Sequence, residues 1–315
     1  DLDSAGDFDG EAISDGKEIV IGGILQHIEQ AGVHSGDSAC SIPPYDSSPK
    51  VIKKIKTEVN KVISNMEIIG LVNVQLAYVN DQVYLLEVNP RASRTIPFVS
   101  KALGIPLARI AAKIMAGKKL KELDFDKVPE LKRYCVKEAV LPFNKFQNVD
   151  PILGPEMRST GEVMGIGSSF AEAFEKAEIA AGVEIPKNGS VFISVRDTDK
   201  QFLSEIVTSL NEEGFELIAT KGTASVIKEM GFKVKPIKKV LEGRPNIIDL
   251  MKNNDVNLVI NTTEGRESIQ DSSSIRRTAL DQKICCTTTI QGAKAICEVL
   301  SKKVDWSYQK LQDMN

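Results

Sequence analysis

The chain has 315 residues, of which 42% are hydrophobic and 26% are charged, and its net charge is −3. This length and composition predict about two soluble domains, and the charge excludes the basic field that would draw the chain to nucleic acid or a membrane surface. No apolar run is long enough to span a bilayer and no signal peptide is evident, so we expect no membrane partner and a cytoplasmic location.

The five cysteines are scattered, and none forms a Cys-x-x-Cys pair. Such a set argues against a disulfide framework or a zinc site, so we expect reduced, buried thiols. Two histidines are too few for a His-rich metal site. The first ten residues are acidic and glycine-rich without an initiator methionine, so we expect the chain to be a piece of a longer protein.

The first half is expected to mix helices and strands. Ser48 is placed to cap a helix that has Pro49 at its first position and apolar residues at helical spacing as far as Met66. The other expected elements are a strand within residues 18–29, a Gly- and Ser-bounded loop at 32–38, a helix at 98–115, a strand at 136–140 and a loop-rich segment at 142–167.

The most informative pattern is a pair of alternating strands joined by a tight turn at residues 80–82. Alternation of polar and apolar residues is the period of a two-faced sheet. With this three-residue loop, the register would place Gln75 opposite Glu87. Asn73 would then lie opposite Asn89, so one face would gather one carboxylate and three amides.

Carboxylate and amide oxygens are hard ligands of the kind that Mg²⁺ or Mn²⁺ takes, usually alongside the phosphates of a substrate. Arg91 and Arg94 follow the second strand at once and could bind those phosphates. The pattern therefore predicts a metal and phosphate site on this hairpin. The alternative is a half-exposed hairpin with a polar face toward solvent.

From residue 183 onward, strands alternate with helices, which predicts a parallel, doubly wound sheet and an α/β fold. We place a domain boundary between residues 182 and 183. The expected strands are 191–195, 215–219, 234–240, 256–260 and 283–287, and the expected helices are 199–213, 224–230, 247–253, 274–281 and 291–302.

Polar residues follow three strands of this predicted sheet at the edge where such sheets bind ligands. One strand runs into Thr220 and Thr223 at a helix N-terminus, where backbone N–H groups and the helix dipole favour an anion. Another ends in Asn261 and Thr263, and Lys200 follows the first strand. These residues predict a phosphate pocket. The alternative is that the threonines and the asparagine are only helix caps.

Position alone indicates that His34 is a hydrogen-bonding loop residue. Glu29 and Asp37 flank the same loop, and Glu138 lies in a later expected strand. Three carboxylates around one pocket would suit a cationic ligand. The alternative, which the sequence alone favours, is that each is a solvated charge.

Several motifs together resemble carbamoyl-phosphate synthase large chains, over essentially the whole chain. The resemblance fits the end of the second ATP-grasp unit, at 1–182, followed by a regulatory domain similar to methylglyoxal synthase, at 183–315. The segments that carry it are a nucleotide loop at 30–40, an ATP-grasp signature at 86–93, and the stretches 141–146 and 154–165.

The resemblance implies phosphorylation of carbamate by MgATP, or with Mn²⁺, to carbamoyl phosphate for pyrimidine and arginine biosynthesis. In phosphoryl transfer the protein mostly positions groups and neutralises charge, so no side-chain nucleophile is needed. Asp7 falls where the family has an acidic ribose contact. The implied site residues are Gln75, Glu87 and Asn89 for the metal, Gly32, Val33, His34, Ser35, Gln75 and Glu87 for ATP, and Arg91 and Arg94 for catalysis.

For the regulatory domain the resemblance implies binding of UMP or IMP, and of an ornithine-like effector. Cys286 and Thr287 stand where some relatives have Tyr and Asp, which argues against ornithine activation but not against nucleotide binding. The implied nucleotide residues are Lys200, Thr220, Thr223, Lys239, Asn261 and Thr263, and those for the ornithine-like effector are Glu29, Asp37, Glu138 and Thr288.

The implied partners are a glutaminase small subunit and the rest of the large chain, in an oligomeric enzyme. The alternative function is an effector-binding module with an inert ATP-grasp remnant, which would lack metal-dependent ADP binding. Methylglyoxal synthase activity is disfavoured because the second half has no histidine to polarise a ketone. A biotin carboxylase-like ligase is disfavoured by the motif at 155–165 and by the second domain.

Overall fold

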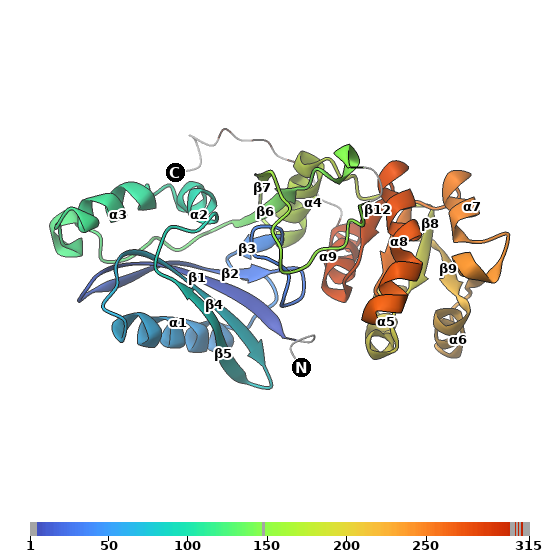
Figure 1. The fold of residues 1–315 in the computed structure, drawn as a ribbon, viewed down its shortest axis with the longest axis horizontal. Coiled ribbons are helices and arrows are strands. Elements are labelled where there is room, and N and C mark those ends of the chain that lie inside the picture. The colour runs from blue at the N-terminus through green and yellow to red at the C-terminus, as the bar shows by residue number, and fades with distance from the viewer. Residues whose placement is uncertain (1–4, 147–148, 303–305, 307, 309, 311–315) are drawn as a thin grey trace.

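The computed structural model describes residues 5–146, 149–302, 306, 308 and 310, so the outer ends of both predicted domains lie outside the described residues. Two β-sheets lie along the long axis of the molecule (Figure 1). The first has seven strands in the order β5-β4-β1-β2-β3-β6-β7, and the second has five in the order β10-β9-β8-β11-β12. No helix of the described residues is long and apolar enough to cross a membrane.

All neighbouring strands of the first sheet are antiparallel. Its strands are β1 (Gly6–Asp15), β2 (Ile19–His27), β3 (Cys40–Ile42), β4 (Ile69–Val79), β5 (Gln82–Asn89), β6 (Tyr134–Val140) and β7 (Gly161–Gly167). The helices of this half are α1 (Pro49–Ser64), α2 (Ile96–Leu103), α3 (Leu107–Met115) and α4 (Phe170–Ala181), with 3₁₀ turns at Leu120–Leu123 and Phe143–Lys145.

Helix α1 covers one face of this sheet, and α2 and α3 cover the other (Figure 1). The predicted cap of α1 is confirmed, because the Ser48 side chain accepts a hydrogen bond from the backbone N–H of Val51. Ile55, Val59 and Ile63 of α1 are buried against the sheet, as their helical spacing predicts.

The single helix predicted at 98–115 is wrong, because the structure has two helices there. Gly104 ends α2 in the left-handed conformation, at a φ of 69°, and α3 begins after Pro106. Proline has no N–H to give to a helix and disfavours helical geometry in the preceding residue. The interruption therefore follows from these two residues.

Three strands and one helix of the first half were not predicted: β1, β3, β7 and α4. Strand β1 is central in its sheet although Asp and Gly, which are poor strand formers, make up half of it. Strand β7 lies in the segment expected to be irregular, and close packing on α4 explains two of its glycines, Gly165 and Gly167. A Cβ on Gly165 would lie 1.9 Å from the backbone oxygen of Ala173 in α4.

The predicted pairing of Gln75 with Glu87 and of Asn73 with Asn89 is confirmed. The predicted three-residue loop is wrong, because Asn80 and Asp81 alone form the turn, both at positive φ as a type I′ hairpin requires. A β-bulge offsets this difference, since Gln75 pairs with Glu87 while its neighbour Leu76 pairs with Leu85. The polar residues thus keep the predicted register although the turn is one residue shorter.

The second sheet is entirely parallel, as predicted. Helices α5, α6 and α9 pack on one face, and α7 and α8 on the other, which is the doubly wound arrangement. Its strands are β8 (Ser190–Ser194), β9 (Glu216–Thr220), β10 (Lys235–Ile237), β11 (Leu258–Asn261) and β12 (Cys285–Thr287). Its helices are α5 (Leu203–Glu212), α6 (Lys221–Glu229), α7 (Ile247–Lys252), α8 (Gly265–Asp281) and α9 (Ile290–Ser301), with 3₁₀ turns at Asp197–Phe202 and Val240–Glu242.

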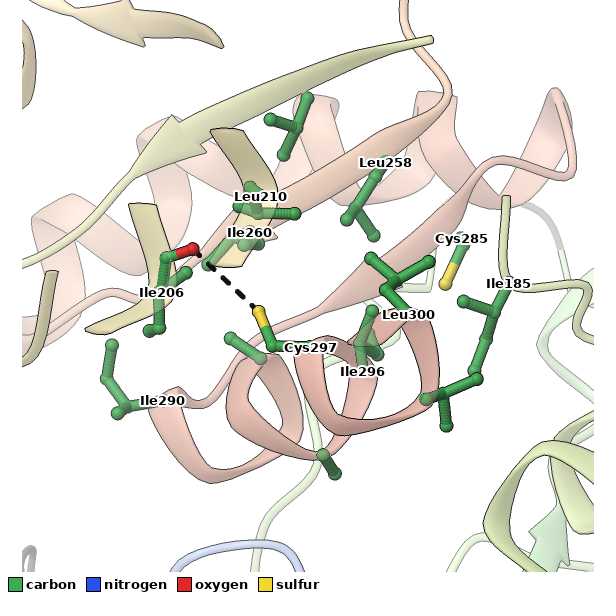
Figure 2. Close-up of a cluster of buried hydrophobic side chains, with 14 of the residues drawn as sticks. Ile185, Ile206, Leu210, Leu258, Ile260, Cys285, Ile290, Ile296, Cys297 and Leu300 are labelled. Carbon is green, nitrogen blue, oxygen red and sulfur yellow. Dashed lines mark hydrogen bonds between the residues drawn. The ribbon is translucent and has the colours of Figure 1, made fainter. Parts of the chain in front are cut away.

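The largest apolar core extends through both halves of the chain. Figure 2 shows its second-half part, where Cys297 of α9 lies against Ile206 of α5, and Leu300 of the same helix lies on the side of Cys285. The same cluster includes Phe174 of α4, a helix that packs on β6 and β7 as well as on α9. The boundary between 182 and 183 stays a prediction. All five cysteines are free thiols.

We expect Gly165→Ala to destabilise the protein by about 2 kcal/mol, because a methyl group there overlaps the α4 backbone. Gly161→Ala in the same strand is a matched control, because its Cβ would lie 3.9 Å from Val140, an ordinary contact. Urea unfolding of both variants measures the difference. Equal free energies of unfolding for the two variants would contradict the close packing of α4 on β7.

Candidate functional site

A pocket of about 550 Å³ lies over the polar face of the β4–β5 hairpin. Every residue predicted to bind ATP or the metal, or to act in catalysis, lines it. These residues are Gly32, Val33, His34, Ser35, Gln75, Glu87, Asn89, Arg91 and Arg94. The structure thus brings together a loop, two strands and the segment after β5, although their roles stay predictions.

Two polar rows cross three strands beneath the pocket. In one row Asp9 of β1 lies opposite Gln75 of β4, which lies opposite Glu87 of β5. The parallel row is formed by Glu11, Asn73 and Asn89 in the same strand order. Because side chains of directly opposed residues point to one face, all six project toward the pocket side of the sheet.

The side-chain oxygens of Gln75, Glu87 and Asn89, at the β5 side of these rows, are ligands that suit a hard cation. No hydrogen bond or ion pair to the Glu87 carboxylate exists within the described part of the chain. Gln75 Nε2 donates to Ser35 Oγ at 3.4 Å, and Asn89 Nδ2 donates to Asn73 Oδ1 at 3.5 Å. Because the nitrogens make these bonds, the side-chain oxygens of Gln75 and Asn89 face other groups. One carboxylate and two amides suit Mg²⁺ or Mn²⁺ when substrate phosphates complete the coordination.

The two arginines lie on the rim of the pocket. Arg91 donates to Asn89 Oδ1 at 3.3 Å and to the Ala92 carbonyl oxygen at 3.1 Å. Arg94 donates to Ser159 Oγ at 3.2 Å and lies 3.4 Å from a carboxylate oxygen of Glu162. Within the described residues, both guanidinium groups therefore keep free N–H donors of the planar, bidentate kind that suits a phosphate.

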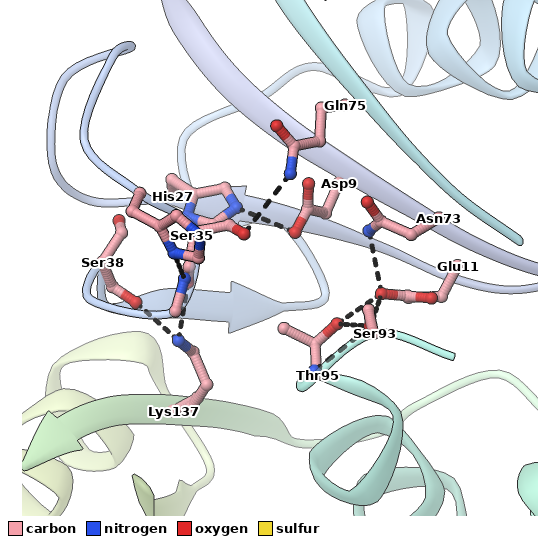
Figure 3. Close-up of polar contacts among 12 residues, drawn as sticks. Asp9, Glu11, His27, Ser35, Ser38, Asn73, Gln75, Ser93, Thr95 and Lys137 are labelled. Carbon is pink, nitrogen blue, oxygen red and sulfur yellow. Dashed lines mark hydrogen bonds and ion pairs between the residues drawn. The ribbon is translucent and has the colours of Figure 1, made fainter. Parts of the chain in front are cut away.

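The loop at 32–36 forms another wall of the pocket. His34 Nδ1 accepts a hydrogen bond from the Gly36 N–H at 3.0 Å, as expected of a loop residue. The His34 N–H donates to the Gly154 carbonyl oxygen at 2.9 Å, which ties the loop to the motif at 154–165. Lys137, fully buried in β6, donates to the carbonyl oxygens of Ser35 and Ser38 (Figure 3).

Two buried carboxylates behind the pocket, Asp9 and Glu11, were missed because β1 was not predicted. Their signal was the alternation of acidic residues with apolar or small neighbours along residues 7–12. Burial and the Asp9 charge raise the pKa of Glu11 to about 7. Burial opposes a charged His27, but Asp9, 3.3 Å from its Nε2, raises the pKa of His27 above its usual value (Figure 3).

Three of the predicted phosphate residues of the second half, Thr220, Thr223 and Asn261, meet at the carboxyl end of β8. Thr220 is the first residue before α6, but its hydroxyl forms hydrogen bonds with Ser194 Oγ at 3.2 Å and with Thr223 Oγ1 at 3.4 Å instead of capping the helix. Asn261 donates to the Ser194 carbonyl oxygen at 3.4 Å. The alternative in which Thr220 and Asn261 act only as helix caps is therefore wrong.

Lys200 and Lys239 both interact with Asp197, and Lys200 Nζ lies 2.7 Å from Asp197 Oδ1. Hydrogen bonding and charge from Lys200, with a smaller contribution from Lys239, lower the pKa of Asp197. Lys200 Nζ would lie 3.7 Å from a Cβ on Gly222, at the start of α6. Thr263 is half-buried in the loop that leads from β11 to α8.

The residues predicted for an ornithine-like effector are only partly together. Burial, then the charges of Glu178 and Glu29, raises the pKa of Glu138 well above its usual value, so these three carboxylates are neighbours. Glu178 of α4 was missed. Asp37 instead accepts hydrogen bonds from the backbone N–H groups of Arg158 and Ser159. Thr288 is half-buried between β12 and α9.

A buried arginine links the two halves of the chain. Arg276 of α8 forms a bidentate ion pair with Asp150, and it donates to Asn261 Oδ1 at 3.3 Å. Arg158 donates to the Asp150 carbonyl oxygen at 3.2 Å, while its own N–H binds Asp37. A continuous set of hydrogen bonds thus joins the predicted nucleotide site to the loop of the first pocket.

Comparison with known proteins identifies both halves. Residues 9–123 match the family model of the carbamoyl-phosphate synthase L chain ATP binding domain, and residues 203–288 match that of the MGS-like domain. The carbamoyl phosphate synthase large chain of Pseudomonas putida is 55% identical over 314 residues, and that of Pasteurella multocida is 51% identical over 317. These matches cover 100% of this chain but 29% and 30% of the relatives.

Among solved structures, the biotin carboxylase domain of a single-chain bacterial carboxylase has a TM-score of 0.42 and 13% identity. The match covers 52% of this chain and 43% of the biotin carboxylase chain. This likeness is too weak to support an argument about function. The resemblance of the motifs to carbamoyl-phosphate synthase large chains is confirmed by the relatives, which match the chain along its whole length.

We expect Glu11→Gln to remove part of the pH dependence of stability. Between about pH 4.5 and about pH 7 the folded protein holds a proton on Glu11 that the unfolded chain releases, so its free energy of unfolding falls as pH rises through this window. Glutamine cannot titrate, so the wild-type value should fall relative to that of the variant. Urea unfolding across this range checks this, and a constant difference would contradict it.

Proposed function

Because the chain belongs to the family of carbamoyl phosphate synthase large chains, we propose that its first pocket is part of a site where MgATP phosphorylates carbamate to carbamoyl phosphate. The observation that supports this is the opposition of Gln75 and Glu87 across a hairpin whose polar face lines one pocket with Arg91 and Arg94. The product would serve pyrimidine and arginine biosynthesis in the cytoplasm.

In this proposal the chain mostly positions charged groups around the transferred phosphoryl group. Glu87, Gln75 and Asn89 would hold Mg²⁺ or Mn²⁺, which neutralises charge on the phosphate oxygens when bound. Arg94 and Arg91 would bind the phosphoryl group and stabilise the charge that spreads over its oxygens in the transition state. The loop from Gly32 to Ser35 would border the nucleoside part of ATP, and Asp7 the ribose.

We further propose that the second half binds a nucleoside monophosphate such as UMP or IMP at the carboxyl end of its sheet. Thr220, Thr223 and Asn261 converge there on the end of β8, and Lys200 lies beside them. The N-terminus of α6 would add N–H groups for the phosphate. The neighbouring Glu29, Glu138 and Glu178 suit a cationic effector such as ornithine.

The curated relatives are more than three times as long as this chain. We propose that the chain acts with the rest of such a large chain and with a glutaminase small subunit, in an oligomer. The alternative is an effector-binding module whose ATP-grasp part is inert. ATP formation from carbamoyl phosphate and MgADP separates the two, because only an active site complete enough for phosphoryl transfer gives ATP.

We expect Glu87→Gln to abolish Mn²⁺-dependent binding of ADP, because this residue supplies the only formal negative charge among the three proposed ligands. Asp81→Asn is a matched control, because Asp81 lies at the turn of the same hairpin and pairs with Lys54 instead of lining the pocket. Titration of free Mn²⁺ in the presence of ADP measures the effect. Unchanged Mn²⁺ affinity in Glu87→Gln would refute the metal assignment.

We expect Thr220→Ala to weaken UMP binding by about 1 kcal/mol, which is roughly a fivefold loss of affinity, because the hydroxyl would no longer bind the phosphate. Ser225→Ala serves as the control, since the Ser225 hydroxyl on the same helix binds the carbonyl oxygen of Lys221. Calorimetric titration with UMP compares the two. Equal affinities would exclude Thr220 from the nucleotide site.

A further inference from the structure

Glu11 lies behind the pocket and does not line it. It is at the centre of β1, with a side chain that is 0% exposed, and it is opposed by Asn73 on one side and by Gly23 on the other. Its Oε1 accepts hydrogen bonds from Asn73 Nδ2, at 2.9 Å, and from the hydroxyls of Ser93 and Thr95 (Figure 3). One carboxylate oxygen therefore holds two separate segments of chain.

The first segment leads to the proposed metal ligands. With its amide nitrogen bound to Glu11, Asn73 turns its Oδ1 toward β5, where it accepts from Asn89 Nδ2 at 3.5 Å. Asn89 in turn presents its Oδ1, which Arg91 contacts at 3.3 Å. Glu11 thus sets which end of the Asn73 amide, and through it which end of the Asn89 amide, faces the pocket.

The second segment carries the arginine of the rim. Ser93 and Thr95 flank Arg94, and both donate to Glu11 Oε1. Their hydroxyls also bind each other at 2.7 Å, and the Thr95 N–H donates to Ser93 Oγ at 3.2 Å. The backbone on both sides of Arg94 is therefore fixed by the same carboxylate that fixes Asn73.

Stability alone does not account for a carboxylate at this position. Burial of a charged group is costly, and Glu11 Oε2 has no hydrogen-bond partner in the described part of the chain. A well-packed apolar side chain of similar volume is often no less stable than a buried charged group. What an apolar side chain cannot do is accept three hydrogen bonds at one point and so align a metal ligand with an arginine.

We propose that Glu11 is a positioning residue that aligns Asn89 and Arg94 for phosphoryl transfer. This inference rests on the proposed function of the pocket. Partners behind metal ligands typically contribute about 10- to 100-fold in metal affinity or activity. Glu11 is in this class although it touches neither the substrate nor the metal.

The test uses the whole natural polypeptide that contains these residues, with Glu11→Leu, Glu11→Gln and a control. The control is Asp15→Leu, because Asp15 is a buried carboxylate of the same strand that accepts three backbone N–H groups, from Lys17, Glu18 and Leu120, away from the pocket. Mn²⁺ titration with ADP, kcat and KM for ATP formation from carbamoyl phosphate, and thermal unfolding are measured for each variant.

We expect Glu11→Leu to lower Mn²⁺–ADP affinity about tenfold and kcat about 10- to 100-fold. Glu11→Gln should stay within about threefold of the parent, since its amide oxygen can accept the same three hydrogen bonds. Asp15→Leu should lower the unfolding temperature without changing Mn²⁺–ADP affinity or kcat. Rescue by glutamine shows that the hydrogen bonds matter and that a charge is not required.

If Glu11→Leu does not fold, Asn73→Ala and Thr95→Val replace it and break the two connections singly. We then expect Asn73→Ala to weaken Mn²⁺–ADP binding and Thr95→Val to lower kcat at unchanged Mn²⁺ affinity. If the variants tested (Glu11→Leu, or Asn73→Ala and Thr95→Val in its place) keep Mn²⁺–ADP affinity and kcat within about twofold of the parent, the positioning role is overturned. The proposed function of the pocket would still stand. A parent protein without Mn²⁺-dependent ADP binding would overturn the proposed function, and this inference with it.

Discussion

The pocket depends on the register of three antiparallel strands, β1, β4 and β5. Because side chains alternate between faces along a strand, a slip of one residue would turn every polar group of both rows into the apolar core beneath α1. The buried partners enforce the register, since Val72, Val74 and Leu76 of β4 face α1 on the opposite side. The bulge in β5 adapts a short type I′ turn to this same register. Packing on one face of the sheet therefore determines the chemistry on the other.

Much of this could be predicted because the hairpin and the parallel sheet have regular periods. Gln75 and Glu87 were placed opposite each other from alternation alone, and the error in the turn did not matter because the bulge compensated for it. Strand β1 was missed because its acidic residues resemble a solvated segment, whereas in the fold Glu11 finds three donors from Asn73, Ser93 and Thr95. Those partners are 62 to 84 residues away in sequence, and no local pattern reveals them.

Contacts between distant segments also explain what was missed elsewhere. No sequence pattern singled out Arg276, but Asp150, Asn261 and the Ile269 carbonyl oxygen surround its guanidinium in the fold. Asp37 was grouped with Glu29 and Glu138 through the family resemblance, whereas its oxygens accept hydrogen bonds from the backbone N–H groups of Arg158 and Ser159. Motifs indicated which residues gather at the first pocket, but which polar groups act as supports became visible only in three dimensions.

Helix α4 joins the two halves of the chain through a shared apolar core. It packs on β6 and β7 with one side and on α9 with another, so its phenylalanines belong to the same apolar core as the second sheet. If the chain were cut after α4, the second half would lose the helix that packs on α9. If it were cut before α4, strands β6 and β7 of the first sheet would lose the helix that covers them. We therefore expect the two halves to unfold as one cooperative unit, although their sheets have different topologies. Such a unit would extend beyond the ranges 9–123 and 203–288 that the two family models match.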